Sequence, residues 1–118
     1  MILADSSIWI DHLRAANPKL DQLLVEWQIA CHPNVIGELA CGNMSERKAR
    51  IRFLQGLPRA PVPGHLEILY FIERHNLMGR GVGYTDMQIL ASTAMLQGLL
   101  WTKDRRLKEA AGSLGLSY

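Results

Sequence analysis

The sequence predicts an α/β fold with a central parallel sheet between helices. The first observation is residues 1–4, an unbroken apolar run that stops at Asp5. A short run of this kind is typical of a strand buried on both faces, most often the central strand of a parallel sheet. Residues 99–102 form a second such run, which is followed by Asp104. Helical patterns alternate with these runs, and that alternation favours a three-layer arrangement with helices on both faces of the sheet.

The first half of the chain is expected to contain a second strand and four helices. Ser6 or Ser7 can cap the first helix, and Asn17, followed by a proline, starts the second. Leucines recur with Trp27 at helical spacing in this second helix, so we expect these side chains in the core. Ser45 is a candidate cap for a basic fourth helix. The expected bounds are 6–13, 17–27, 35–41 and 46–55 for the helices and 29–31 for the strand.

The second half is expected to contain an edge strand, the apolar strand at 99–102 and three helices. Prolines between 57 and 63 leave room only for a short edge strand at 60–62. Residues 64–77 form a helix whose apolar face is wide enough to need covering, for example by a second copy of the chain. Thr85 can cap a helix over 86–97, which Gly98 terminates. The last helix is expected at 105–111.

Length and composition are those of one globular domain that covers residues 1–118. Hydrophobic residues make up 48% of the chain, but no apolar run approaches the ~18 residues of a membrane span. The chain opens directly into the first strand, without a signal-peptide pattern. Cys31 and Cys41 are ten residues apart, which fits neither a zinc site nor a disulfide scaffold. We therefore expect a cytoplasmic protein with reduced thiols and no membrane contact.

Four acidic residues follow strands of the expected sheet or lie in the helices after them; they are Asp5, Glu38, Asp86 and Asp104. In a right-handed parallel sheet every strand-to-helix junction lies at the same edge, so these carboxylates can converge although they are far apart in the sequence. Clustered like charges repel strongly unless protons or cations are present. Oxygen ligands without His or Cys select Mg²⁺ or Mn²⁺. The sequence therefore predicts a magnesium or manganese site.

Such a site suits hydrolysis of a nucleic-acid backbone. A divalent cation can bind a phosphodiester oxygen, lower the pKa of a bound water and stabilise the leaving oxygen. The net charge is only +2, but without the four acids 13 basic residues remain against 7 of the 11 acidic ones. A basic surface around an acidic pocket favours a polyanionic substrate. None of the four histidines shares a spacing with a nucleophile or a metal motif.

Other interpretations of the acids stay open at this point. Asp5 after a strand can simply cap a helix, and Asp86 or Asp104 can stabilise a helix start through the macrodipole. Glu38 on a helix can be solvated. The chain would then be a binding module whose basic stretch at 47–52 holds RNA or a protein. A phosphatase of the haloacid-dehalogenase type would need a second aspartate two residues after the first, where this chain has a serine.

Basic residues near the acids are candidates for contacts to RNA. Arg80 lies in the glycine-rich loop 79–83, which lacks the Gly-Lys-Ser/Thr ending of a phosphate-binding P-loop. We interpret this loop as a mobile lip of the cleft, with Arg80 as a phosphate contact. Lys103 and Arg105 flank Asp104 and are further candidates. The nearest acid outside the quartet, Asp11, is expected to pair locally with an arginine three residues on, at position 14.

Four segments, in this order, resemble PIN-domain ribonucleases of the VapC toxin type, which occur in bacterial and archaeal toxin–antitoxin pairs. The segments are LADSSIWIDHL at 3–13, VIGELACG at 35–42, GVGYTDMQILAS at 81–92 and LWTKDRRL at 100–107. They are spread over nearly the whole chain, and the combination is more specific than any one of them. The resemblance implies a PIN-like three-layer α/β/α fold with the first strand in the middle of the sheet.

The resemblance also implies an activity and partners. The four acids would hold Mg²⁺ or Mn²⁺ and catalyse the cleavage of single-stranded RNA. Ser6 and Thr102 match positions where the family carries a hydroxyl beside the metal, although Thr is commoner than Ser at position 6. The implied protein is an endoribonuclease toxin that forms a homodimer and is inhibited by a small VapB-like antitoxin, whose tail enters the cleft. The apolar face at 66–72 is a candidate for the antitoxin groove or for the dimer contact.

Overall fold

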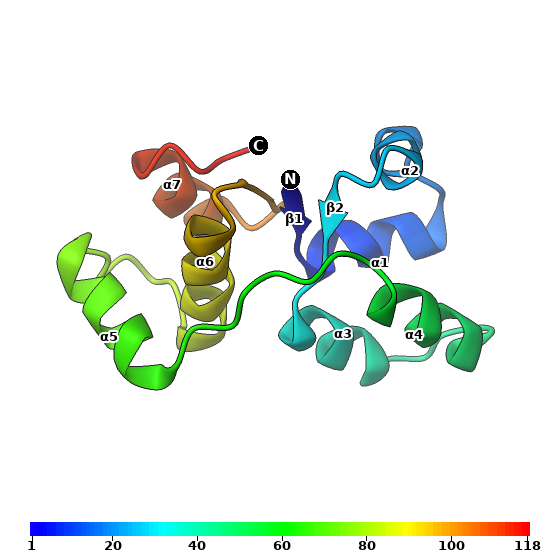
Figure 1. Cartoon of the computed structure of the whole chain (residues 1–118), viewed down its shortest axis with the longest axis horizontal. Helices are drawn as coiled ribbons and strands as arrows, with labels where there is room; N and C mark the ends of the chain where they lie inside the picture. Colours follow the sequence, from blue (N-terminus) through cyan, green and yellow to red (C-terminus); the bar gives the residue numbers. More distant parts are fainter.

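The computed structural model describes residues 1–118 and contains a parallel sheet of three strands in the order β2-β1-β3 (Figure 1). Strand β1 (Ile2–Ala4) is central and pairs with β2 (Ile29–Ala30) on one side and with β3 (Leu99–Trp101) on the other. Every residue of β1 is buried, as expected for an apolar strand that is covered on both faces. The predicted α/β fold with the first strand in the middle of a parallel sheet is therefore confirmed.

Isolated bridges extend the sheet by one residue at each edge. Beyond β2, Cys31 pairs with Arg59, and the amide of Ala60 donates to the carbonyl of Cys31 (3.1 Å). Beyond β3, a similar bridge joins the sheet to Ser117 near the end of the chain. The edge strand predicted at 60–62 is thus reduced to a single bridge one residue earlier, because the prolines around it have no N–H to donate.

The first half of the chain contains the helices α1 (Ser6–Arg14), α2 (Pro18–Val25), α3 (Pro33–Ala40) and α4 (Arg47–Gln55). Asn17 caps α2 as predicted, since its side chain accepts two backbone N–H bonds from the first turn. Ser45 does not cap α4, because the N-cap residue is Glu46 in a left-handed conformation (φ 50°). The predicted burial of Trp27 is wrong: α2 ends before it, its φ of 55° turns the chain, and the side chain is 63% exposed.

The second half contains the helices α5 (His65–Arg74), α6 (Tyr84–Leu96) and α7 (Arg105–Ser113). Helix α6 begins one residue before Thr85, with Gly83 as its N-cap residue, so Thr85 is not the cap. This start places Asp86 in the first turn of α6. The helix is terminated by Gln97 in a left-handed conformation (φ 56°) rather than by Gly98. Gly98 is constrained instead by its close contact with the carbonyl of Met1, immediately before β1.

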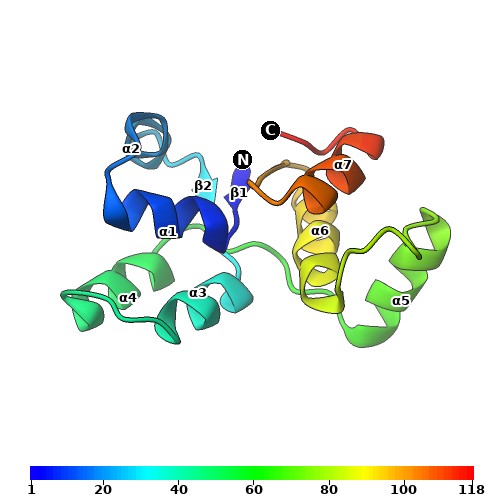
Figure 2. The ribbon, with the colours of Figure 1, turned by 180° about the vertical axis from the view of Figure 1, so that it is seen from behind.

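The helices lie on both sides of the central strand. Figures 1 and 2 show α1 to α4 on one side of β1 and α5 to α7 on the other. The molecule measures 41 × 24 × 22 Å along its principal axes. Helix α1 packs on α3, whereas α6 packs on β3 and α7, so the strand ends are flanked by helices from both halves of the chain. None of the helices has the length and the apolar content to cross a membrane.

The two cysteines are not bonded to each other. Cys31 is buried beside β2, and Cys41 is exposed at the end of α3. Burial raises the pKa of the Cys31 thiol to about 11, and a hydrogen bond with the backbone of His32 lowers it only in part. Cys31 therefore stays protonated at neutral pH and behaves as a small apolar side chain of the core.

Candidate active site

Asp5 lies at the carboxyl end of β1 and is buried. Its Oδ1 accepts hydrogen bonds from the amides of Ser7 (3.0 Å) and Ile8 (3.4 Å) and from the Ser7 hydroxyl. Its Oδ2 accepts a hydrogen bond from the Thr102 hydroxyl. Asp5 therefore caps α1, in place of the Ser6 or Ser7 expected there. The cap does not use the whole carboxylate, because Oδ2 accepts only one donor and keeps a second lone pair.

Asp104 occupies the equivalent place after β3. It is the N-cap residue of α7, and its Oδ1 accepts a hydrogen bond from the amide of Leu107 (3.1 Å). Its own amide donates to the hydroxyl of Thr102 (3.1 Å). Thr102 therefore joins the backbone of Asp104 to the carboxylate of Asp5. This contact fixes the two strand ends, which are almost one hundred residues apart in the sequence, beside each other.

Glu38 lies on α3 and is exposed. Its Oε2 accepts a hydrogen bond from the Ser6 hydroxyl (2.8 Å), which belongs to the first turn of α1. Ser6 follows Asp5 directly, so this bond holds the carboxylate of Glu38 next to the end of β1. The packing of α1 on α3 supports the same arrangement.

Asp86 lies in the first turn of α6 but does not cap that helix, whereas Asp5 and Asp104 each cap one. Its carboxyl is half-buried, and burial raises the pKa of that carboxyl above its usual value of 3.8. The negative charges of Asp104, Asp5 and Glu38, in this order, raise the pKa further. Asp86 therefore lies within electrostatic reach of the other three carboxylates.

The side chains are nevertheless not arranged as a closed ligand cage. In their present orientations, no three acidic, histidine or cysteine side chains are close enough together to hold one metal ion. Like charges repel, and three of the four carboxylates are turned toward hydroxyl or amide donors. A cation would have to draw at least some of them together by side-chain rotation. All the donors are oxygens, which suits Mg²⁺ or Mn²⁺.

The chain resembles known proteins over nearly its whole length. It is 44% identical over 118 residues to "Ribonuclease VapC32" from two strains of Mycobacterium tuberculosis, and the match covers 99% of this chain and 95% of the relative. The chain belongs to the VapC ribonuclease family. No family model matches the sequence.

The fold of this VapC-family chain is PIN-like. Its structure is similar to the crystal structure of PAE2754 from Pyrobaculum aerophilum, with a TM-score of 0.61 over 92% of this chain and 78% of that chain. The two sequences are 17% identical, so this comparison supports the fold alone. The predicted membership in the PIN-domain, VapC-type family is confirmed.

The basic residues proposed for RNA contacts have other partners in this VapC-family chain. Arg80 donates to the hydroxyl of Ser113 (3.0 Å), at the end of α7. Asp104 lies at the other end of that helix, about 13 Å away along its axis. Lys103 forms an ion pair with Asp11, so the predicted local partner of Asp11 is wrong. Arg105 is exposed and pairs with Glu109 one turn later (3.7 Å). Contacts from these three side chains to RNA stay predictions.

Two polar contacts near the acids were missed from the sequence. The Ser7 hydroxyl, besides donating to Asp5, accepts a hydrogen bond from the amide of Lys103 (3.1 Å). Asn34 donates to the side chain of Gln88 (2.6 Å) and so joins α3 to α6. Helical spacing could have pointed to Asn34, which lies one turn before Glu38, but not to Gln88, because residues two apart on a helix, such as Asp86 and Gln88, do not face each other. No signal in the sequence pointed to Ser7, since the family resemblance singled out Ser6 instead.

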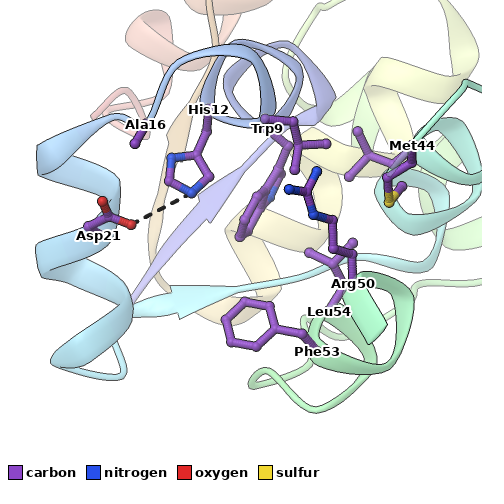
Figure 3. A pocket seen from close by; sticks show the side chains of 10 residues that line it. Trp9, His12, Ala16, Asp21, Met44, Arg50, Phe53 and Leu54 are labelled. Atoms are coloured by element: carbon purple, nitrogen blue, oxygen red, sulfur yellow. Dashed lines mark ion pairs between the residues drawn. The ribbon is translucent and has the colours of Figure 1, made fainter. Parts of the chain in front are cut away.

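Two apolar grooves lie away from the acids. One, of about 430 Å³, lies between α1, α2 and α4 (Figure 3). It holds the ion pair of His12 with Asp21 (3.6 Å), and Trp9 on its wall has a buried indole N–H without a partner. The other, of about 510 Å³, lies between α5 and α6, and its wall includes the exposed side chains of Leu66 and Tyr70.

Proposed function

We propose that this VapC-family chain is a Mg²⁺- or Mn²⁺-dependent endoribonuclease that cleaves single-stranded RNA and acts as the toxin of a toxin–antitoxin pair. The observation that carries the proposal is the grouping of the acids at the strand ends: Thr102 joins Asp104 to Asp5, and Ser6 holds Glu38 beside the end of β1. Asp86 is near enough for their charges to add to the effect of burial in raising its pKa. Four carboxylates in one region of a ribonuclease relative favour a cation site. The name of the relatives supports RNA as the substrate.

The residues present fit a divalent cation. Asp86 has both oxygens available, Asp104 and Glu38 have one oxygen each without a donor, and Asp5 has a free lone pair on Oδ2. When bound, the ion would bind a phosphodiester oxygen and lower the pKa of the attacking water. The protein would supply the rest: Thr102 and Ser6 orient Asp5 and Glu38, and the partial burial of Asp86 strengthens electrostatic interactions.

The metal requirement is tested by cleavage of a single-stranded RNA oligonucleotide. We expect cleavage with Mg²⁺ or Mn²⁺, none in excess EDTA, and recovery when Mn²⁺ exceeds the EDTA. The thermal unfolding midpoint should also rise with Mn²⁺, because an ion that binds only the folded state stabilises it. Cleavage that survives EDTA would contradict the metal-dependent mechanism.

RNA binding without cleavage in any metal would favour the alternative binding module. The structure offers this alternative little support in the basic stretch of α4, because the guanidinium of Arg47 is already bonded to carbonyl groups at Ala40 and Gly42.

The homodimer is proposed to form through the face that α5 and α6 share. Leu66 is 79% exposed and Tyr70 is 68% exposed, which is unusual for large side chains at an apolar groove. Glu67 and Arg74 lie on the same wall, two turns apart on α5. A two-fold axis across this face would bring Glu67 of one copy to Arg74 of the other, so the surface is complementary to itself.

Leu66→Glu is expected to convert the dimer into a monomer, because it places a charge in the apolar contact. Mass by light scattering checks this result. Val25→Glu is the matched control, since Val25 is 80% exposed at the end of α2 and far from α5 in the fold. If Leu66→Glu is still a dimer, the dimer contact does not lie on this face. Loss of inhibition by the antitoxin in a persistent dimer would assign the face to the antitoxin instead.

A further inference from the structure

We propose that Ser7 is a positioning residue that acts through Asp5 and Asp104 on the affinity of the site for its divalent cation. The inference rests on the proposed metal-dependent function. Ser7 is half-buried in the first turn of α1, and its hydroxyl lies between the carboxylate of Asp5 and the loop that joins β3 to α7.

The direction of the hydroxyl proton follows from its two partners. The amide of Lys103 can only donate, so the Ser7 oxygen accepts that bond (3.1 Å). Its single proton is then directed to Oδ1 of Asp5. Thr102 repeats this arrangement on the other oxygen: it accepts from the amide of Asp104 (3.1 Å) and donates to Oδ2 of Asp5. The hydroxyls of Ser7 and Thr102 therefore each donate to one oxygen of Asp5. Each of them also accepts a bond from one of two consecutive amides in the same loop.

These hydrogen bonds of Ser7 and Thr102 have two consequences for a cation site. First, Oδ1 of Asp5 accepts three donors, all from Ser7 and Ile8, so its lone pairs are occupied and Oδ2 is left as the oxygen for a ligand. Second, Ser7 attaches α1 to the amide of Lys103, one residue before Asp104. Without that bond, the backbone of this loop loses its direct hydrogen bond to α1, and the remaining ties are Thr102 to Asp5 and the side-chain ion pair of Lys103 with Asp11.

Hydrogen-bond partners of metal ligands typically affect metal affinity or activity by about 10–100-fold. We therefore expect Ser7→Ala to weaken Mn²⁺ binding by about 10-fold or more, measured by calorimetric titration of Mn²⁺ into the protein without RNA. Ser7→Thr keeps the hydroxyl and should restore the affinity to within about 3-fold of the original, well inside that range. The control is Ser117→Ala, whose hydroxyl makes no hydrogen bond to the acids and whose Mn²⁺ affinity should not change.

A second measurement separates positioning from general stability. Amide hydrogen exchange of Lys103 in EDTA should become faster in Ser7→Ala and not in Ser7→Thr, whereas exchange in the core of β1 should be unchanged. At saturating Mn²⁺ most of the cleavage rate should return, since the substitution removes no ligand. If Ser7→Ala does not fold, Ser7→Cys replaces it, because a thiol of similar shape is a weak donor and acceptor.

The outcomes distinguish this inference from the proposed function. If the unsubstituted protein neither binds Mn²⁺ nor cleaves RNA, the proposed function is wrong. An original protein that does both, together with a Ser7→Ala protein of equal Mn²⁺ affinity, would overturn only the role of Ser7. Equal losses in Ser7→Ala and Ser7→Thr would also overturn it, because side-chain volume rather than the hydroxyl would then be responsible.

Discussion

Asp86→Asn is expected to reduce the cleavage of RNA by more than about 100-fold, the upper end of the effect of residues that only support a metal ligand. Asp86 is the best acid for this test because it caps no helix and accepts none of the hydrogen bonds that hold the other three. Asp5→Asn would keep a capping oxygen but lose the second oxygen, which accepts the bond from Thr102. The measurement is kcat/KM for a single-stranded RNA at saturating Mn²⁺.

The same substitution should raise the stability of the metal-free protein at pH 7. The pKa of Asp86 is raised in the folded state above 3.8, so ionisation opposes folding. This opposition is fully present above the folded pKa and absent below the unfolded pKa. The gain in Asp86→Asn should therefore be present at neutral pH in EDTA and disappear as the pH falls through the folded pKa toward 3.8. Thermal unfolding in EDTA at several pH values tests whether the gain in stability disappears as the pH falls.

A matched control is Asp21→Asn, because Asp21 also lies in the first turn of a helix, α2. Its carboxylate is near His12 (3.6 Å) and not near the other acids, so its removal should leave cleavage unchanged and give no gain in stability. An Asp86→Asn protein that still cleaves RNA at the original rate would remove Asp86 from the site. An unchanged unfolding midpoint in EDTA would contradict the repulsion between the four carboxylates.

Gly98→Ala is expected to destabilise the protein by about 1–3 kcal/mol, as overpacking of a close contact does. Gly98 is buried immediately before β3, and a Cβ at this position would overlap the carbonyl oxygen of Met1. That oxygen accepts a hydrogen bond from the amide of Leu99 (3.1 Å) at the start of the β1–β3 pairing. The backbone cannot move away without weakening this pairing. The free energy of unfolding in urea measures the loss.

Gly37→Ala provides the control for the change from glycine to alanine. Gly37 lies inside α3, and a Cβ there would meet nothing within 4 Å. Alanine should stabilise this helix by about 0.5–1 kcal/mol, because glycine loses more backbone entropy on folding. If both substitutions changed the stability in the same direction, the contact between Gly98 and Met1 would not be the cause.

Local patterns determined much of this molecule. The apolar run that begins the chain predicted β1 at the centre of a parallel sheet, because a strand buried on both faces is typically a continuous apolar run. Asn17 before a proline was sufficient for the start of α2. The order of the four acids along strand-to-helix junctions predicted one common edge, and the charges of the other three raise the pKa of Asp86.

Contacts between distant residues were decided only by the tertiary structure. Gly98 was expected to end a helix, yet glycine is needed there because a Cβ would overlap the carbonyl oxygen of Met1. Asp11 was expected to pair within its helix, yet Lys103 is its partner. The family resemblance singled out Ser6 and not Ser7, and the contact of Ser7 with the loop after β3 appears only in the tertiary structure. The physical reason is common to all three: periodicity and capping depend on neighbours within one or two turns, whereas these contacts depend on which strand ends the sheet brings side by side.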